Sequence, residues 1–304
     1  MHRKIKIILN PMADMGNAWR VARDLRSITE QHGGIDWSGT VYPGHAIDLA
    51  KQSEGYDMVI AMGGDGTVHE VMNGLMQIPE NKRPILGVVP VGSGNDFGHS
   101  LKASTNPNEA LKRAINGEAS TVDLGLMTDG EGRKEYFDNT LGIGFGATVT
   151  IRSHKLPILR GFLMYLTAVI QTIIFDHNPI KMQIESDGEK WEQSVIYLIV
   201  CNGPREGGGF LVAPEAKIDD GIFHYAMITN VSRAMMFRIV PEVMKGTHGR
   251  FKQVRMGTCK KFTLTADRPL YIHADGEIYS GPGSDLRKVS FEILPNALKV
   301  VRGK

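Results

Sequence analysis

The strongest indication of chemistry in this sequence is a glycine-rich pentapeptide, Gly63–Thr67, which contains one carboxylate, Asp65. It follows the apolar run Met58–Met62 and precedes Val68–Gln77, whose apolar residues recur at helical spacing. Glycines let backbone N–H groups approach an anion, and the start of a helix adds partial positive charge. A phosphate would repel Asp65 unless a cation lay between them, so the pattern favours a nucleotide bound with Mg²⁺. The alternative is an ordinary glycine-rich turn in which Asp65 caps the helix.

A second glycine-rich loop, Pro90–Gly98, follows the next apolar run, Ile85–Val89. The carboxyl ends of parallel strands lie at the same edge of a sheet, and ligands bind in the crevice outside that edge. The two loops are therefore expected to face one crevice, where a long ligand could lie across both. An independent turn without ligand contact is the alternative.

Two further carboxylates, Asp275 and Glu277, flank a single glycine after the expected strand Leu270–Ala274. Phosphoryl transfer to a hydroxyl needs phosphate positioning, Mg²⁺ and an acceptor for the hydroxyl proton. The glycine permits a tight turn, and two neighbouring carboxylates cannot both stay ionised cheaply without a cation. One is expected to take the proton while the other holds Mg²⁺ or water; a plain hairpin turn is the alternative. Asp96 and Asp123 would either extend this carboxylate network or cap local structure.

The N-terminal part of the chain alternates apolar strand-like runs with amphipathic helical patterns. The strand-like runs are Ile5–Leu9, Met58–Met62 and Ile85–Val89, and the helical patterns are Trp19–Gln31, Val68–Gln77 and the segment beginning Asn108–Ala114. This alternating order predicts an α/β nucleotide-binding domain with a parallel sheet over residues 1–123.

Strands dominate beyond about Val122, separated by turns such as Asp219-Asp220-Gly221. The expected strands are Glu135–Leu141, Ile180–Ser186, Ser194–Cys201, Ile222–Ile228, Lys261–Leu264, Leu270–Ala274 and Val289–Ile293. They predict a C-terminal β-sandwich domain over residues 124–295, interrupted by helical segments near 157–176 and 232–245. The last apolar run, Leu298–Arg302, would allow residues 296–304 to rejoin the first domain.

One helical segment, within His154–His177, is apolar nearly all round. Its apolar residues are Phe162, Leu163, Met164, Leu166, Val169, Ile170, Ile173 and Ile174. Such a helix is either buried or in contact with lipid. His154, Lys155 and Arg160 precede it, as expected if one end meets anionic headgroups. A core helix is the alternative, and both interpretations hold if the helix walls a lipid cleft.

Composition limits the classes of function. The 304 residues include 35 basic and 33 acidic ones, a formal charge of +2, which argues against a nucleic-acid binder that works by bulk charge. No segment reaches the ~20 apolar residues that span a bilayer. The two cysteines, Cys201 and Cys259, lack metal-ligand spacing, and the N-terminus shows no secretory signal. These features predict a reduced, cytoplasmic compartment.

Taken together, the motifs resemble those of the diacylglycerol kinase catalytic family, the bacterial lipid kinases related to sphingosine kinases. The resemblance covers nearly the whole chain. It rests on Asn10-Pro11, Gly63–Thr67, Pro90–Gly98, Asn202 with Gly207-Gly208-Gly209, Pro214 with Asp219-Asp220-Gly221, and Asp275-Gly276-Glu277. The pentapeptide alone is shared with NAD kinases and phosphofructokinases, whereas the whole series in this order is much more specific.

The resemblance implies a lipid kinase that depends on ATP and Mg²⁺. It places ATP against Asn10, Pro11, Met12, Ala13, Asp14, Thr40, Gly63, Gly64, Asp65, Gly66, Thr67, Val68, His69 and Ser93. It also implies a structural Mg²⁺ held by the Asp220 carboxylate and the carbonyls of Lys217 and Ile222. Glu277 becomes the first choice as catalytic base with Asp275 as its partner, while Asp65 serves the metal. The chain departs from the family pattern in its late glycine, Gly16, and in His69, where the family often has Asn.

Three functions remain open at this stage. The first is a lipid kinase in peripheral contact with a membrane, acting on diacylglycerol before other lipids. An NAD kinase shares the fold and the pentapeptide, but Pro90–Gly98 favours the lipid enzyme. A lipid-binding module without turnover is opposed by the joint presence of Asp65, Asp275 and Glu277. The sequence leaves the lipid and the oligomeric state open, a homodimer included.

One further motif points to a different cofactor. Gly142–Ala147 matches the dinucleotide fingerprint G-x-G-x-x-A. The acidic residue expected about 20 positions later is absent, since that stretch is Gly161–Leu166. The sequence therefore argues against an NAD site of the Rossmann type, and it contains no P-loop motif.

Overall fold

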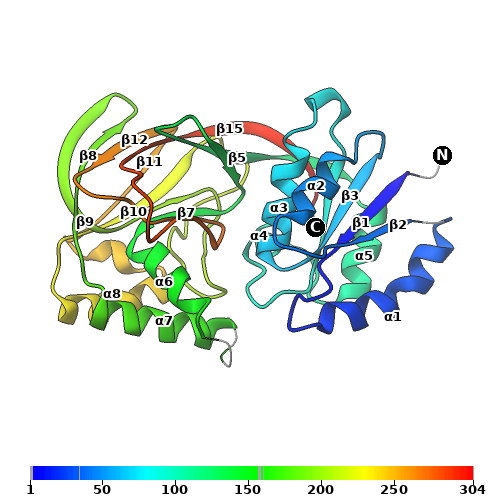
Figure 1. Ribbon diagram of the computed structural model, residues 1–304, viewed down its shortest axis with the longest axis horizontal. Helices are drawn as coiled ribbons and strands as arrows, with labels where there is room; N and C mark the ends of the chain where they lie inside the picture. Colours follow the sequence, from blue (N-terminus) through cyan, green and yellow to red (C-terminus); the bar gives the residue numbers. More distant parts are fainter. Residues whose placement is uncertain (1–2, 34, 157–158, 160, 304) are drawn as a thin grey trace. The chain divides into compact units, whose positions relative to one another are not determined.

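The computed structural model describes residues 3–33, 35–156, 159 and 161–303. They form two compact units, Met1–Val122 with Asn296–Lys304, and Asp123–Pro295 (Figure 1). The chain passes from one unit to the other twice, each time within a strand, first β5 (Ala119–Asp129) and then β15 (Lys288–Val301). The end of the chain therefore belongs to the same unit as its beginning.

The first unit is built on a parallel sheet. Its strands are β1 (Ile5–Leu9), β2 (Asp36–Gly39), β3 (Met58–Gly63) and β4 (Ile85–Pro90), in the spatial order β4-β3-β1-β2. Every residue of β3 is buried, because helices cover both faces of the sheet, and this explains its unbroken apolar sequence. Near the end of β15, Val300 pairs in parallel with Leu86 and so adds to this sheet.

Helices lie on both faces of this sheet (Figure 1). They are α1 (Asn17–Gln31), α2 (His45–Lys51), α3 (Asp65–Leu75), α4 (Asp96–Ser100) and α5 (Pro107–Asn116), with a short 3-10 helix at Glu80–Lys82. α1 and α5 share one apolar cluster with the strands, and α2 packs against α3. α5 starts where Pro107 follows Asn106, whose side chain accepts the N–H of Asn108, as an N-cap does.

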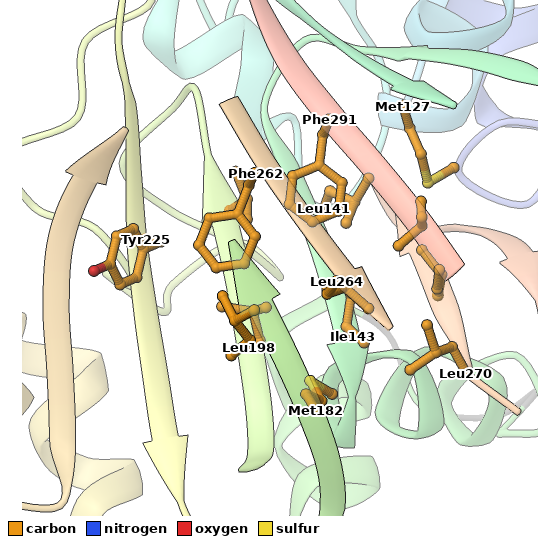
Figure 2. Packing of buried hydrophobic residues seen from close by; sticks show 14 of the residues in the cluster. Met127, Leu141, Ile143, Met182, Leu198, Tyr225, Phe262, Leu264, Leu270 and Phe291 are labelled. Atoms are coloured by element: carbon orange, nitrogen blue, oxygen red, sulfur yellow. The ribbon is translucent and has the colours of Figure 1, made fainter. Parts of the chain in front are cut away.

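The second unit is an antiparallel β-structure. Its strands besides β5 and β15 are β6 (Lys134–Phe137), β7 (Thr140–Gly144), β8 (Ile180–Ser186), β9 (Glu189–Cys201), β10 (Phe223–Thr229), β11 (Val254–Cys259), β12 (Lys261–Ala266), β13 (Ile272–Ala274) and β14 (Glu277–Ser280). The hydrogen-bonded path runs β14-β13-β7-β9-β8-β12-β15, with β10 on β9 and β11 on β10. Figure 2 shows the core of this unit, in which Phe262 stacks on Phe291 and lies edge-on to Tyr225.

Three helices cover a face of this β-structure: α6 (Phe145–Ser153), α7 (Gly161–Phe175) and α8 (Arg233–Lys245), and a 3-10 helix follows at His248–Arg250. β9 shows how the two sides are divided. Tyr197, Ile199 and Cys201 pack in the cluster that includes these helices, whereas Leu198 and Val200 pack in the opposite cluster of Figure 2. The alternation of side chains along a strand accounts for this division.

Some elements differ from the sequence-based expectations. The predicted strand Glu135–Leu141 is wrong as a single element, because the chain breaks at Asp138-Asn139 between β6 and β7. The physical reason is the buried Asp275 carboxylate, which accepts the backbone N–H groups of Asp138 and Asn139 at the break. α2, α4 and α6 are short helices that apolar periodicity did not predict. No helix among the described residues is long and apolar enough to cross a membrane.

Candidate active site

The glycine-rich turn of the first unit joins β3 to α3. Gly64 precedes the helix with an extended backbone, and Asp65 is the first of its 11 residues. A side chain on Gly63 would collide with Thr67, so the two ends of the turn pack directly together. Asp65 and Gly66 stay partly exposed. The turn therefore presents backbone N–H groups and one carboxylate at a helix start, which suits a phosphate accompanied by a cation.

The second glycine-rich loop packs onto this turn. A Cβ on Gly92 would collide with the Cα of Gly64, and a Cβ on Gly94 would lie 2.7 Å from the Asp65 carboxylate. The backbone N–H of Phe97 donates to Asp65 Oδ1 at 3.4 Å. The expectation that the two loops meet at one edge of the sheet is confirmed. Glycine is needed at 92 because the two backbones approach this closely, and Gly94 leaves room for the Asp65 carboxylate, which the second loop orients.

The ends of β1 and β2 reach the same edge of the sheet. The N–H of Asn10 donates to the Met62 carbonyl at 3.0 Å, and the N–H of Thr40 donates to the Leu9 carbonyl at 2.8 Å. Both predicted ATP contacts are thus fixed by backbone hydrogen bonds to a neighbouring strand. The first of these bonds places the Asn10 loop beside the start of the glycine-rich turn.

The loop from Asn10 to Gly16 runs through left-handed backbone. The φ angle is 49° at Asp14, 55° at Met15 and 88° at Gly16, so the late glycine serves the last of three such positions. Met12 and Met15 expose 73% and 65% of their surface. The loop therefore offers an apolar surface next to the glycine-rich turn, of the kind that lines nucleotide and small-molecule sites.

Three of the predicted ATP-binding positions have buried side chains: Thr67, Val68 and His69. The His69 Nε2 atom lies 3.3 Å from the Asn73 Nδ2 atom one helical turn later. These side chains hold the turn in place, so any contact that they make with a nucleotide runs through the backbone. Ser93, by contrast, is exposed in the second loop.

Sequence reasoning did not single out Glu70, which closes the N-terminus of α2. Its carboxylate accepts the N–H groups of Gly44 at 2.8 Å and Ala46 at 3.1 Å. An acidic side chain stabilises the positive end of a helix. Glu70 stands 26 positions after Gly44 in the sequence, so no local pattern announces this contact.

In the second unit, Asp275 and Gly276 form the two-residue turn of a hairpin, and Glu277 follows as the first residue of β14. Ala274 of β13 pairs with Glu277 of β14, and φ is 51° at Asp275 and 86° at Gly276. Tight hairpins of this kind favour Asp-Gly. The hairpin turn that the sequence left as an alternative is therefore present. It leaves the Glu277 side chain exposed directly after the turn.

The two carboxylates of this turn have different surroundings. Asp275 is 8% exposed, and its carboxylate accepts the backbone N–H groups of Asp138, Asn139 and Thr140, each at 2.9 Å. Within the described part of the chain, the Glu277 carboxylate makes no hydrogen bond or ion pair. Asp275 thus anchors the turn and breaks the strand between β6 and β7, while Glu277 is accessible to a substrate.

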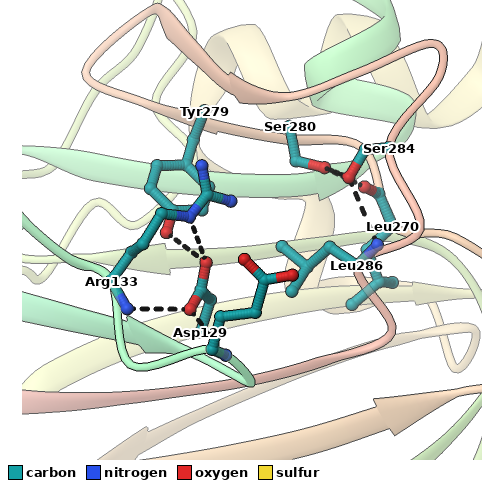
Figure 3. Close-up of polar contacts among 8 residues, drawn as sticks. Asp129, Arg133, Leu270, Tyr279, Ser280, Ser284 and Leu286 are labelled. Atoms are coloured by element: carbon teal, nitrogen blue, oxygen red, sulfur yellow. Dashed lines mark hydrogen bonds and ion pairs between the residues drawn. The ribbon is translucent and has the colours of Figure 1, made fainter.

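The other end of β14 is held by a second polar cluster (Figure 3). The Tyr279 hydroxyl and the Arg133 Nε atom both donate to Asp129 Oδ2, each at 2.7 Å. Next in the strand, the Ser280 hydroxyl donates to the Leu270 carbonyl at 2.8 Å. Burial alone would raise the pKa of Asp129, but the hydrogen bonds from Tyr279 and Arg133 outweigh it and lower that pKa to about 2.

We expect Asp129→Asn to lower the free energy of unfolding by about 2 kcal/mol at pH 7. Because the folded-state pKa lies below the ordinary 3.8, this stabilisation is complete above that pH and is lost as the pH falls through about 2. Urea unfolding across pH 7 to 2 measures it. Asp267→Asn, which removes a half-exposed partner of Arg268, is the control and should change stability little. A difference between wild type and Asp129→Asn that is the same at pH 2 and pH 7 would contradict the assignment.

The turn Lys217–Ile222, predicted to hold a structural Mg²⁺, lies against a buried carboxylate. Asp123 is 1% exposed and accepts the N–H of Gly221 at 2.6 Å. No group of three His, Cys, Asp or Glu side chains among the described residues gathers as a metal site, so carbonyl oxygens would have to complete any ligand set. The predicted ligands, the Asp220 carboxylate and two carbonyls, are the oxygen donors that Mg²⁺ prefers. The residues present therefore fit the metal.

The glycines of the segment Gly142–Ala147 serve packing instead of phosphate binding. A Cβ on Gly142 would collide with the His273 imidazole, and a Cβ on Gly146 with the Tyr197 ring. The segment consists of the last three residues of β7 and the first three of α6, with no loop between them. The packing of His273 and Tyr197 therefore accounts for both glycines.

Two family profiles match the chain. The diacylglycerol kinase catalytic domain matches residues 4–127, and the YegS C-terminal NAD kinase beta sandwich-like domain matches residues 139–302. A Yersinia enterocolitica protein named "Probable lipid kinase YegS-like" is 29% identical over 94% of this chain and 91% of its own length. One of the same name from Yersinia pestis is 31% identical over 79% of this chain and 77% of its own length. The diacylglycerol kinase of Staphylococcus saprophyticus is 29% identical over 98% of both chains.

Solved structures share the fold. A diacylglycerol kinase from Bacillus anthracis str. Sterne superposes with a TM-score of 0.73 at 20% identity, covering 99% of this chain and 97% of that one. An NAD kinase from Archaeoglobus fulgidus in complex with ATP gives a TM-score of 0.55 at 12% identity, covering 99% and 94%. The predicted fold class, an N-terminal α/β domain with a C-terminal β-sandwich domain, is confirmed.

Proposed function

The chain belongs to the family of YegS-like lipid kinases and diacylglycerol kinases, and we propose that it transfers the γ-phosphoryl group of ATP to the hydroxyl of diacylglycerol. Membership of a kinase family implies ATP as the phosphoryl donor. The observation that carries the proposal is the contact between the glycine-rich loops at Gly64 and Gly92, with Asp65 at the start of α3. The product would be phosphatidic acid.

In this proposal the first unit binds and orients the phosphates. The N–H groups at the start of α3 attract their negative charge, and the second loop holds Asp65 in place through Phe97. Mg²⁺, when bound, would neutralise charge on the phosphates, and Asp65 is the carboxylate of this turn that would hold it. The Asp220 carboxylate with the carbonyls of Lys217 and Ile222 would hold a second, structural ion.

The second unit supplies the proton acceptor in this proposal. The oxygen of the lipid hydroxyl forms a bond to the γ-phosphorus of ATP, and Glu277 takes the proton of that hydroxyl. The bond between the γ-phosphorus and the oxygen of the leaving ADP breaks. The exposed and unbonded Glu277 carboxylate suits this role. Asp275, with three backbone N–H groups bound, is a positioning residue that holds the turn.

Helix α7 supports a peripheral contact with lipid. Its buried side is formed by Ala168, Val169, Thr172 and Ile173. Leu163 and Phe175, on the other hand, expose 63% and 67% of their surface. Lys155, just after α6, and Arg233, the first residue of α8, are exposed cations that would favour anionic headgroups, while the predicted Arg160 lies outside the described residues. We therefore place the membrane contact on the exposed side of α7.

We expect Leu163→Ser to weaken binding to anionic vesicles by about 5-fold, since about 1 kcal/mol of apolar contact with lipid is lost. The apparent KM for lipid rises, whereas the Kd for ATP stays unchanged. Vesicle sedimentation and steady-state kinetics on mixed micelles measure both effects. Met256→Ser removes a partly exposed apolar side chain from β11 in the same unit and serves as the control. Equal vesicle binding by the two variants would argue against α7 as the contact.

A lipid panel tests the substrate. The protein is incubated with labelled ATP and mixed micelles of diacylglycerol, ceramide, a sphingoid base or phosphatidylglycerol. We expect the highest kcat/KM with diacylglycerol. A higher value with another lipid would assign the chain a different lipid substrate within the same reaction class.

A further inference from the structure

A buried carboxylate lies in the second unit outside the groups assigned so far. Glu206 is 5% exposed and stands in the loop that follows β9. The Tyr197 hydroxyl donates to its Oε2 atom at 2.8 Å, and the His273 Nε2 atom lies 2.8 Å from its Oε1 atom. The Tyr165 hydroxyl of α7 is a further hydrogen-bond partner. One carboxylate thus joins α7, β9 and β13.

The charge on this cluster follows from its surroundings. Burial would raise the pKa of Glu206, but His273, Tyr197 and Tyr165 outweigh it and hold that pKa below its ordinary value. Burial, together with the Glu206 charge, raises the pKa of Tyr197 well above its ordinary value. Glu206 is therefore an ionised acceptor, and the tyrosines are neutral donors.

The Glu206 carboxylate fixes the orientation of the His273 imidazole, because its Oε1 atom lies 2.8 Å from the His273 Nε2 atom. On the other side of the ring, the backbone N–H of Gly276 donates to the His273 Nδ1 atom at 3.4 Å. Gly276 is the central glycine of the Asp275–Glu277 turn. The contact thus runs from Glu206 through His273 to the backbone of that turn.

Packing leaves His273 little freedom. Gly142 lies opposite it in β7, and any side chain there would collide with its ring. The pairing of β13 with β14 shifts register between Ile272 and His273, so that His273 pairs with Ile278. Such irregularities re-aim side chains beside functional sites. Gly142, the first glycine of the segment that matches a dinucleotide fingerprint, is therefore explained by the space that the His273 ring requires.

We propose that Glu206 is a positioning residue for the turn that carries Glu277, and that it acts through His273. This inference rests on the proposed role of Glu277. A buried carboxylate is costly without polar partners, and this cost is offset here by two tyrosine hydroxyls and by the His273 imidazole 2.8 Å away. Small displacements of a catalytic group lower reaction rates strongly. Fixing this turn would prevent such displacements of Glu277.

The kinetic test compares Glu206→Gln with wild type in lipid phosphorylation. The variant keeps the volume but removes the charge that holds the His273 imidazole in place. We expect kcat to fall about 10- to 100-fold while KM for ATP and the melting temperature change little. His248→Gln alters another buried histidine of the same unit, which contacts the Val212 carbonyl, and is the control. An unchanged kcat in folded Glu206→Gln would overturn the proposal.

A second readout does not depend on lipid kinase activity. Hydrogen–deuterium exchange of a peptide covering Asp275–Glu277 should become faster in Glu206→Gln and stay unchanged in His248→Gln. If the wild type phosphorylates no lipid but this exchange still responds, the proposed function fails while the positioning role stands. Should Glu206→Gln not fold, Tyr197→Phe deletes a single hydroxyl and should accelerate the same exchange less strongly. Exchange at the turn that is identical in wild type and every folded variant of this cluster would overturn the inference.

Discussion

Replacing Glu277 by Gln is expected to lower kcat for lipid phosphorylation by about 10²- to 10⁴-fold, the range that a positioned general base contributes. A lipid hydroxyl is a poor nucleophile at neutral pH, and the amide of Gln cannot take its proton. ATP binding should be unchanged, because Glu277 belongs to the second unit and the glycine-rich loops to the first. The fold should also be unchanged, because the Glu277 side chain is exposed and unbonded within the described residues.

Steady-state kinetics from pH 6 to 9, combined with ATP titration, measure this effect. Glu292→Gln replaces another exposed glutamate of the same unit, on β15, and should retain wild-type kcat. If Glu277→Gln kept wild-type kcat across this pH range, Glu277 would not be the base, and Asp275 or Asp65 would have to be considered.

The second large effect is expected for Asp65→Ala, with a loss of about 10²- to 10³-fold in kcat, typical for removing an electrostatic partner of the reacting groups. The variant removes the carboxylate that would hold Mg²⁺ against the phosphates. The fold should survive, because Asp65 is partly exposed at the first turn of α3. Kinetics at several Mg²⁺ concentrations and thermal unfolding measure both quantities.

Asp65→Asn separates charge from structure. Its amide oxygen can still accept the Phe97 N–H, as the Asp65 carboxylate does. We expect Asp65→Asn to lower kcat nearly as much as Asp65→Ala does. The reason is that the loss of the negative charge, and not the loss of the hydrogen bond, lowers the rate. If a folded Asp65→Ala protein kept wild-type turnover, Asp65 would not be the residue that holds Mg²⁺.

The parts of the fold that local sequence determines could be predicted. β3 and β4 are continuous apolar runs because both faces of the sheet are covered, and their ends are marked by glycine loops whose backbones touch at Gly64 and Gly92. Strand β8 alternates buried and exposed residues over Ile180–Ser186, the pattern from which it was predicted. In these segments the local pattern and the final packing agree.

The parts that depend on distant partners could not be predicted. The break at Asp138-Asn139 arises because Asp275, 136 positions after Asn139, binds the backbone there. Glu206 meets His273 and Tyr197, and Asp129 meets Tyr279, only after the strands have assembled. Helix α7 shows the same limit: its composition indicated burial or lipid contact, and only packing shows that one side is buried while Leu163 is exposed.

The most direct test of the proposed reaction is a competition in a single tube. Purified protein is given ATP labelled in its γ-phosphoryl group, Mg²⁺, NAD in the aqueous phase, and diacylglycerol in mixed micelles. After extraction, the label should appear in the organic phase as phosphatidic acid, and Glu277→Gln should nearly abolish it. Label found in aqueous NADP would show an NAD kinase instead, and label found in neither product, with ATP bound, would contradict diacylglycerol as the substrate.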